Sequence, residues 1–356
     1  WEALQRGDED RSQAFLTGKL KIEGDIQTMA RHEAMIQALS DGGPGATHQD
    51  ADGVAGILTG SVPEIDDDRR HRPGPDSLPL WNESFWFPMY DPVRDLGVIL
   101  RAGAHPNKGE ANLYLFITHR GEIVHTHVDT RASEAPFAPE RLAMANGLTI
   151  EWTKPLEEFR LRYASDRSGF DLTWRAMSPP YLYPPPPGTT SDQVPRHIEG
   201  AGTVSGTVTI GGVTHPFEGV GHRDHSFGGE RDWDKFYKWN YLSGEFDDFW
   251  FNAVRIQFGP DFPEVHIGCV WNGREHHGLA KVEMDVATAD GGARQTGVDL
   301  RITDASGAVH HIVGDKIFAN GCVRIQRTWI KDAFTRYRMG DRVGYGILEH
   351  GYREDD

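Results

Sequence analysis

From about residue 79 to the end of the chain, hydrophobic and polar residues alternate in short segments that are separated by turn residues. Examples are GVILRAG, NLYLFIT and FRLRYAS in the first half, and EVHIGCVWNG, VDLRITD and CVRIQRTWI in the second. A period of two is typical of strands that bury one face, and regular short strands with turns indicate an antiparallel sandwich or barrel. We therefore predict a mainly β protein with two β domains in tandem, over residues 79–215 and 216–356.

The N-terminal part of the chain follows a different pattern. Residues 14–25 resemble a short strand, and the hydrophobic residues that follow recur at helical spacing, with Asp25 as the N-cap. One strand and one amphipathic helix cannot enclose a core, so we predict that residues 1–41 are the end of another domain, cut short at Trp1. Residues 42–78 are rich in Gly, Asp, Pro and Arg, which favours a linker or an extended arm, solvated or laid across a neighbouring surface.

Composition narrows the classes of partner and compartment. The net charge of -16 disfavours nucleic acid, because phosphate binding needs a concentrated basic surface. No hydrophobic run approaches the roughly 18 residues that cross a bilayer, and the chain does not open with a signal segment. The two cysteines, Cys269 and Cys322, suit a reducing compartment. We predict a soluble, cytoplasmic protein, and leave open peripheral membrane contact and a homodimer formed through exposed edge strands.

Residues 219–241, GVGHRDHSFGGERDWDKFYKWNY, concentrate acids, bases, cations and aromatic rings. If this segment is a strand, His222 and Asp224 face one side while Arg223 and His225 face the other. A carboxylate beside an imidazole is a workable general acid and base couple, because burial raises the pKa of a carboxyl and a neighbouring charge tunes the pKa of a His. The segment therefore suits a pocket in which one pair faces a cavity and the other braces it.

Two other interpretations of the segment stay open. Asp224 can pair with Arg223 or Arg231 in a buried salt-bridge network that only stabilises the strand. His222, Asp224 and His225 can also supply nitrogen and oxygen ligands to a metal ion, but without a Cys pair or an HExxH spacing we predict no metal site. The chain has no Gly-rich phosphate loop between a strand and a helix and no GxSxG elbow, so we also predict no cofactor.

The phrase GVGHRDHSFGGERDW resembles the GHRDHSWG and RDW signature of a bacterial family related to carotenoid 1,2-hydratases. ESFWFPMYDP at residues 83–92 and HIEGAGTVSGTVTIGG at residues 197–212 agree in the same order, so the likeness spans roughly residues 79–352. Phe227 stands where the family usually has Trp, and Gly200 stands where relatives often have Gln. The resemblance implies two tandem lipocalin-like β domains.

A second resemblance covers only about the first forty residues. The phrase TGKLKIEGD at residues 17–25 is similar to the one that precedes the closing helix of the sterol carrier protein 2 family. The resemblance implies that most of a lipid-binding domain lies upstream of Trp1, in a natural fusion.

Relatives of the first family include hydratases that protonate an isoprenoid alkene, pericyclases that shape a polyene for cyclisation, and proteins of unknown activity, so fold alone does not choose the reaction. Alkene hydration needs an acid over the double bond, aromatic faces against the carbocation, and a base that activates water. We expect Asp224 to be the acid, and His222 or His225 to be the base or proton relay. An Arg beside Asp224 would instead keep this carboxyl ionised.

The remaining polar and aromatic residues near the segment are the expected substrate contacts. The rings following the motif would face the cation, and each is worth on the order of 1 to 2 kcal/mol when water is excluded. His197 and Glu199 precede a strand that a turn can return to the motif, and they can equally form a surface pair. The expected contacts are Arg223, Arg231, Trp233, Trp239, Tyr241, His197 and Glu199.

Together, the residues and the resemblance favour a cofactor-independent lyase of the carotenoid 1,2-hydratase type. It would add or remove water, or shift a double bond, on a hydrophobic isoprenoid or steroid-like lipid (a terpenoid, for example) by general acid and base catalysis. One alternative is a carrier that binds a hydrophobic ligand without converting it. Another is a pericyclase of the Diels-Alderase kind, which accelerates a reaction by shape alone.

Overall fold

A computed structural model describes residues 60–75, 77–133, 136–184, 195–262, 264–290, 294–316 and 321–354. The strand and helix predicted within residues 1–41 lie outside the described residues, as do residues 42–59 of the 42–78 segment. The described residues are mainly in antiparallel strands, which confirms the predicted tandem β architecture. Their helical elements are α4 (Ile65–Asp68) and the 3-10 turns η1 (Pro106–Lys108) and η2 (Trp233–Lys235). None of the helices in this part of the chain has the length and apolar character to cross a membrane.

The first domain is an open antiparallel sheet of eleven strands. Their order is β4-β3-β2-β1-β11-β10-β8-β7-β6-β5, and the short β9 pairs with β10. The strands are β1 (Trp81–Asp91), β2 (Leu96–His105), β3 (Glu110–His119), β4 (Glu122–Ala132), β5 (Arg141–Ala143), β6 (Thr149–Lys154), β7 (Glu158–Ala164), β8 (Gly169–Ala176), β9 (Tyr181–Leu182), β10 (Arg196–Ile210) and β11 (Val213–Glu230). Leu100 and Leu115 from one half of the sheet share a core with Leu161 and Trp174 from the other half. The sheet therefore curves into a half-barrel around its own core.

The second domain is a closed barrel. Its strands pair in sequence from β12 to β17, and the pairings of β17 with β19 and of β20 with β12 close the cylinder, with β18 attached to β19. The strands are β12 (Lys238–Glu245), β13 (Trp250–Gln257), β14 (Val265–Trp271), β15 (His276–Ala289), β16 (Arg294–Asp304), β17 (Val309–Lys316), β18 (Gly321–Ile325), β19 (Thr328–Met339) and β20 (Arg342–Arg353). Leu242, Phe251, Leu300 and Leu348 belong to the core that fills the barrel.

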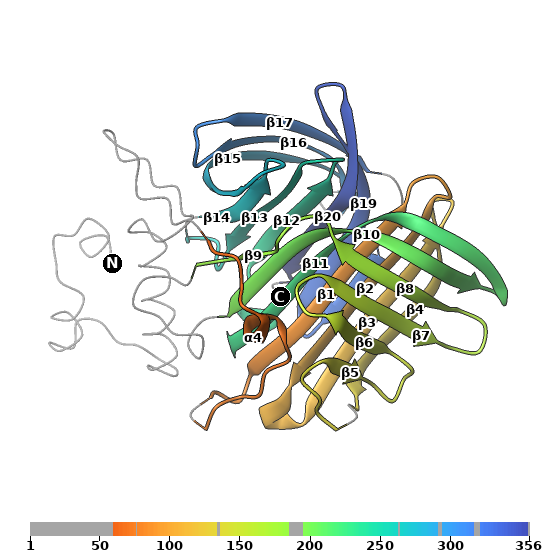
Figure 1. Ribbon diagram of the computed structural model, residues 1–356. Coiled ribbons are helices and arrows are strands. Elements are labelled where there is room, and N and C mark those ends of the chain that lie inside the picture. Colours follow the sequence, from red (N-terminus) through yellow and green to blue (C-terminus); the bar gives the residue numbers. More distant parts are fainter. Residues whose placement is uncertain are drawn as a thin grey trace, which may run out of the picture.

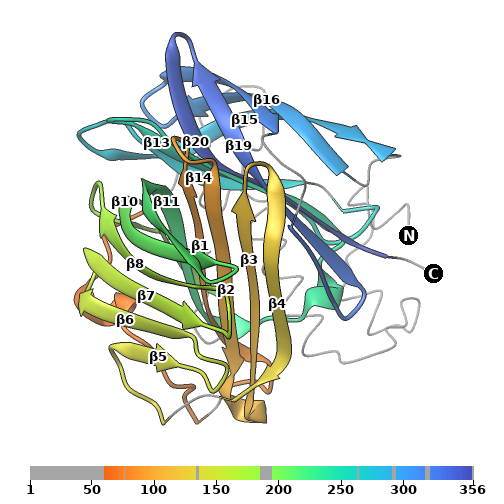
Figure 2. The same ribbon diagram turned by 90° about the vertical axis from the view of Figure 1, so that its right-hand side faces the viewer.

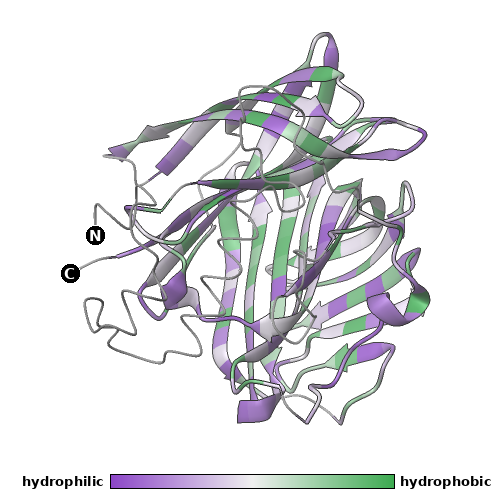
Figure 3. Ribbon diagram, turned by 90° about the vertical axis from the view of Figure 1, so that its left-hand side faces the viewer, coloured by the Kyte–Doolittle hydropathy of each residue, from purple (hydrophilic) through white to green (hydrophobic). Residues whose placement is uncertain are grey.

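The barrel, coloured teal to blue, is stacked on the half-barrel, coloured orange to green (Figure 1 and Figure 2). Hydrophobic and hydrophilic positions alternate along the strands, as Figure 3 shows. On β1, Phe85 and Phe87 point into the core of the half-barrel, whereas Trp86 and Tyr90 point towards the barrel. We call the shared cluster between the domains the interdomain layer. Its larger side chains are Trp86, Tyr90, Tyr114, Phe116, Trp233, Trp239, Tyr241 and Phe334.

The chain changes domain after β11. β11 pairs with β1 on one side and with β10 on the other, so it belongs to the half-barrel, and η2 then leads to β12 of the barrel. The predicted boundary after residue 215 therefore falls within β11, whereas the sheets change between Glu230 and Lys238. The motif at residues 219–241 therefore begins on β11, the last strand of the half-barrel, and spans this change of domain.

Candidate functional site at the interdomain layer

Residues 219–230 of the motif form the C-terminal part of β11, where the side chains alternate as predicted, and residues 231–241 continue through η2 into β12. Asp224 lies opposite Trp86 of β1 and Glu199 of β10, and faces the barrel. Arg223 and His225 point to the other side, into the half-barrel, where His225 stacks on Phe85 with ring centroids 4.4 Å apart. The motif therefore contributes to two separate clusters, one on each face of the sheet.

On the barrel side, His222 lies between two carboxyl groups. Its Nε2 is 2.9 Å from Oε2 of Glu199, and its Nδ1 is 3.1 Å from Oε1 of Glu245. The hydroxyl of Tyr241 donates to the same oxygen of Glu199 at 2.6 Å. Burial lowers the pKa of His222, but Glu199 and Glu245 outweigh it and raise this pKa to about 9. His222 is therefore an imidazolium at neutral pH, buried and compensated by the two carboxyls.

Asp224 is the second acid on this face. Burial raises its pKa, but the charge and hydrogen bond of His197, at 3.3 Å from Nδ1 to Oδ1, and the charge of Arg231 bring it below its ordinary value. Arg231 donates to the hydroxyl of Ser226 at 3.0 Å. The conflict foreseen from the sequence is real, because Asp224 is held ionised and cannot donate a proton in this state.

The barrel supplies a carboxyl pair to the layer. Asp332 of β19 and Glu349 of β20 are directly opposite each other, and Trp239 donates its indole N–H to Glu349. No N–H or O–H group of the described residues donates to either oxygen of Asp332. Burial and the adjoining Glu349 carboxyl raise the pKa of Asp332 well above its ordinary value. The two adjoining carboxyls therefore disfavour ionisation of each other, which favours retention of a proton by the pair.

Two arginines complete the layer. Arg101 lies over the ring of Trp233 at 5.0 Å, and Arg231 lies over the same ring at 5.4 Å. Burial, together with the charge of Arg101, lowers the pKa of Arg231 to about 10. Asp224 and Glu349 raise the pKa of both arginines, so these two acids lie within electrostatic range of Arg101 and Arg231.

The opposite face of β11 is a compensated ionic cluster. Arg223 donates to Asp68 at 2.5 Å, and both side chains are at most 1% exposed. Glu83 accepts from His71 and His225, and although burial raises its pKa, these partners bring it down to about 2. Asp68 and His71 belong to the segment that composition alone suggested to be a linker or arm, and here it lies against the half-barrel.

The structure thus brings together most of the predicted site residues but separates two of them. His222, Asp224, His197, Glu199, Arg231, Trp233, Trp239 and Tyr241 all contribute to the layer. Arg223 and His225 do not, so the predicted pairing of Asp224 with Arg223 is wrong, and a metal site of His222, Asp224 and His225 does not form. Four residues of the layer were not predicted from the sequence: Arg101, Glu245, Asp332 and Glu349.

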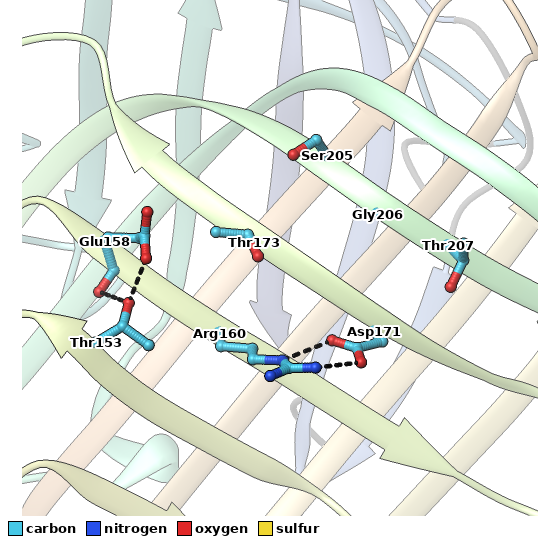
Figure 4. Close-up of a pocket in the computed structure, with 8 residues that line it drawn as sticks. All are labelled: Thr153, Glu158, Arg160, Asp171, Thr173, Ser205, Gly206 and Thr207. Atoms are coloured by element: carbon cyan, nitrogen blue, oxygen red, sulfur yellow. Dashed lines mark hydrogen bonds and ion pairs between the residues drawn. The ribbon is translucent and has the colours of Figure 1, made fainter.

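The surface of the half-barrel has a cavity that is separate from the interdomain layer. A shallow cavity of about 480 Å³ lies on the polar outer face of β6, β7, β8 and β10 (Figure 4). Its polar groups are largely paired with each other, since Arg160 binds Asp171 and Thr153 donates to Glu158. It offers no unpaired acid or base among the residues that line it, which are Thr153, Glu158, Arg160, Asp171, Thr173, Ser205, Gly206 and Thr207.

Solved structures identify the class of fold as tandem lipocalin-like β domains. An AttH protein from Nitrosomonas europaea is 14% identical, with a TM-score of 0.61 and coverage of 83% of this chain and 98% of that chain. Kievitone hydratase from Nectria haematococca is 12% identical, with a TM-score of 0.55 and coverage of 87% and 97%. CghA is 9% identical, with a TM-score of 0.57 and coverage of 83% and 94%. At these identities the likeness shows the fold alone, and it confirms the predicted fold class.

The family follows from the sequence match. The model described as "Domain of unknown function (DUF7064)" matches residues 64–353, and the chain belongs to this family. The model of the SCP-2 sterol transfer family matches residues 1–37, in agreement with the second resemblance noted above. No curated protein matches the chain.

Proposed function

We propose that the protein is a cofactor-independent hydratase or dehydratase, or a double-bond isomerase, whose substrate is a hydrophobic isoprenoid or steroid-like lipid bound at the interdomain layer. One observation carries the proposal: two buried acids whose pKa values are shifted in opposite directions project into the same aromatic layer from opposite domains. Burial and Glu349 raise the pKa of Asp332, whereas His197 and Arg231 bring the pKa of Asp224 below its ordinary value although it is buried. Such a pair of separated pKa values is how acid and base roles are divided at one pH.

Hydration then proceeds as follows. Asp332 transfers its proton to one alkene carbon, and the π electrons form the new C–H bond and leave a carbocation on the other carbon. Asp224, with His197, accepts a proton from water as the water oxygen bonds to the cation. The product is the substrate plus one water, and a proton passes from Asp224 back to Asp332 to reset the protein. This assignment moves the acid role from Asp224, where the sequence placed it, to Asp332.

The same groups also support the isomerase version of the proposal. After protonation by Asp332, Asp224 removes a proton from a neighbouring carbon instead of from water, and the double bond shifts. Trp233, Trp239 and Tyr241 present π faces to the cation. Arg101 and Arg231 supply N–H donors for an oxygen at the polar end of the lipid.

A screen in heavy-oxygen water tests the proposal. The purified protein is incubated with a panel of terpenoid and steroid alkenes in water enriched in oxygen-18, and the extracted lipids are analysed by mass spectrometry. We expect one substrate to gain one water molecule that carries the heavy oxygen, or an alkene isomer of unchanged mass but altered retention. Failure of every alkene to change, in the presence of measurable binding, would reject catalysis.

Binding of an alkene without conversion would favour the second candidate function, that of a lipid carrier. The match of residues 1–37 to the SCP-2 sterol transfer family supports this candidate. Lipid that is bound tightly and recovered unchanged is its expected signature. A converted substrate without any added or exchanged proton would instead point to the pericyclase alternative.

A further inference from the structure

Three side chains that could ligate a metal converge on the inner face of the half-barrel, away from the interdomain layer. His71 comes from the segment that precedes β1, Glu83 from β1, and His225 from β11. Oε1 of Glu83 is 3.2 Å from Nδ1 of His71 and 3.4 Å from Nε2 of His225. One donor atom from each residue lies within 4.8 Å of the others.

The two separations from Glu83 suit a bound ion. A tetrahedral ion with bonds of about 2.0 to 2.2 Å holds its ligand atoms roughly 3.2 to 3.6 Å apart. The two distances from Glu83 to His71 and His225 fall in or at the edge of this range, and are longer than the usual hydrogen bond of about 2.9 Å. Two imidazoles and one carboxylate are a donor set that first-row divalent metals prefer.

The surroundings hold the ligands in place. His225 stacks on Phe85, and His71 stacks on Phe227 with ring centroids 3.9 Å apart. The other nitrogen of His225, Nδ1, is buried without a hydrogen-bond partner among the described residues. It lies 4.0 Å from Oδ1 of Asp68, on the side where an outer carboxylate orients a metal-binding His.

The cluster also has a route for the ion. The side chain of His71 is 24% exposed, whereas Glu83 and His225 are each 1% exposed. The ion therefore enters from the His71 side. Arg70 donates to Oε2 of Glu83 at 3.3 Å, and Oε1, which faces the two imidazoles, also accepts the backbone N–H of His71 at 2.7 Å.

We propose that His71, Glu83 and His225 form a binding site for a divalent first-row transition metal ion such as Zn²⁺. The ion joins the segment before β1 to β1 and β11, so it fastens this segment to the sheet on the face opposite the interdomain layer. The inference does not depend on the proposed function. It replaces the prediction of no metal site, and it uses residues other than the trio considered from the sequence.

The second group of potential ligands, His197, Glu199 and Asp224, is a poorer candidate. Two of its three donors are carboxylates, so it offers a first-row metal fewer imidazole nitrogens than His71, Glu83 and His225 do. Its members also hydrogen-bond within the layer, where Oε2 of Glu199 accepts from Tyr241 and His222. This group provides the matched control for the experiment.

The test uses the full chain, stripped with a chelator and titrated with Zn²⁺ by calorimetry, and with Co²⁺ by its absorption spectrum. The wild-type protein and His197→Ala are expected to bind one equivalent, and Zn²⁺ is expected to raise the melting temperature of both. In His71→Ala, whose side chain is partly exposed, and in Glu83→Gln, binding should weaken by more than the about 10- to 100-fold that loss of an outer-shell partner costs.

Circular dichroism of each apo variant verifies that it is folded before titration. His71→Ala keeps the experiment decisive if Glu83→Gln does not fold. The proposal is overturned if the wild-type protein takes up no Zn²⁺, or if His71→Ala binds it as tightly as the wild type. It is equally overturned if His197→Ala loses the ion, because the second group would then be the site.

Discussion

The two faces of β11 use the same residue types in different ways. On the inner face, Arg223 and Asp68 form a tight pair, and Glu83 is surrounded by donors, so every charge has a partner of opposite sign. On the outer face, His197 and Arg231 lower the pKa of Asp224, whereas burial and Glu349 raise the pKa of Asp332 across the layer. Charge pairs stabilise a fold, whereas two acids with separated pKa values can divide acid and base roles. We therefore expect substitutions of the inner cluster to affect mainly stability, and substitution of Asp332 to affect turnover.

The largest expected effect is a loss of turnover when Asp332 of the interdomain layer is substituted. Asp332→Asn removes the transferable proton but keeps the shape and neutrality of the side chain, so catalysis should fall by about 10²- to 10⁴-fold while folding is retained. Steady-state rates with the alkene found in the screen measure this loss. Asp341→Asn, in the exposed turn between β19 and β20, is the matched control and should match the wild-type rate. Equal activity of the two variants would remove Asp332 as the acid.

The next largest effect is a loss of stability when Arg223 on the inner face of β11 is substituted. Arg223→Met leaves the buried carboxylate of Asp68 without its partner, which should lower the free energy of unfolding by about 3 to 5 kcal/mol. The control is Arg160→Met, because Arg160 and Asp171 are 44% and 46% exposed, and solvent screening should make the loss of their pair much less costly. Urea denaturation of both variants decides the matter. Similar losses in the two would contradict the contrast between the faces.

The pH dependence of stability sharpens the comparison further. Because the pKa of His222 is raised from 6.5 to about 9 in the folded state, its contribution is complete below pH 6.5 and is lost as pH rises through 9. The contribution is on the order of 3 kcal/mol. Urea denaturation between pH 6 and pH 10 should show a steeper decline for the wild type than for His222→Gln. Parallel curves would mean that His222 is neutral in the folded protein.

The smallest expected effect is a loss of turnover on substitution of an aromatic residue of the interdomain layer. Trp233→Leu removes a π face from the cation and should reduce turnover by about 5- to 30-fold, equivalent to about 1 to 2 kcal/mol. The affinity for substrate, measured separately by binding, should change less than the rate. If the order is reversed, with Trp233→Leu more damaging than Asp332→Asn, shape matters more than proton transfer and the pericyclase alternative gains.

Much of this arrangement could be predicted from the sequence, because a period of two fixes which side chains share a face. That rule correctly separated His222 and Asp224 from Arg223 and His225. Applied to WIKDAF of β19, it would also have revealed Asp332, which occupies a hydrophobic position between Ile330 and Phe334. A carboxyl on the buried face of a strand was the available signal.

Other features could not be predicted because they depend on contacts between distant parts of the chain. The acidic and basic run around Asp68 has the composition of a solvated linker, yet Asp68 is buried because its partner Arg223 is 155 residues away. The protonation state of Asp224 likewise depends on His197 and Arg231, which only the paired strands bring close to it. The composition of a segment shows which charged residues it contains, but not which residues of other segments they contact in the folded protein.

The most direct test of proton donation at the interdomain layer is a reaction in deuterium oxide with the substrate identified by the screen. The account predicts that the wild-type protein places one deuterium on a carbon of the product, detected by NMR, and that Asp332→Asn places almost none in the same time. A converted product without deuterium would contradict proton donation by the protein.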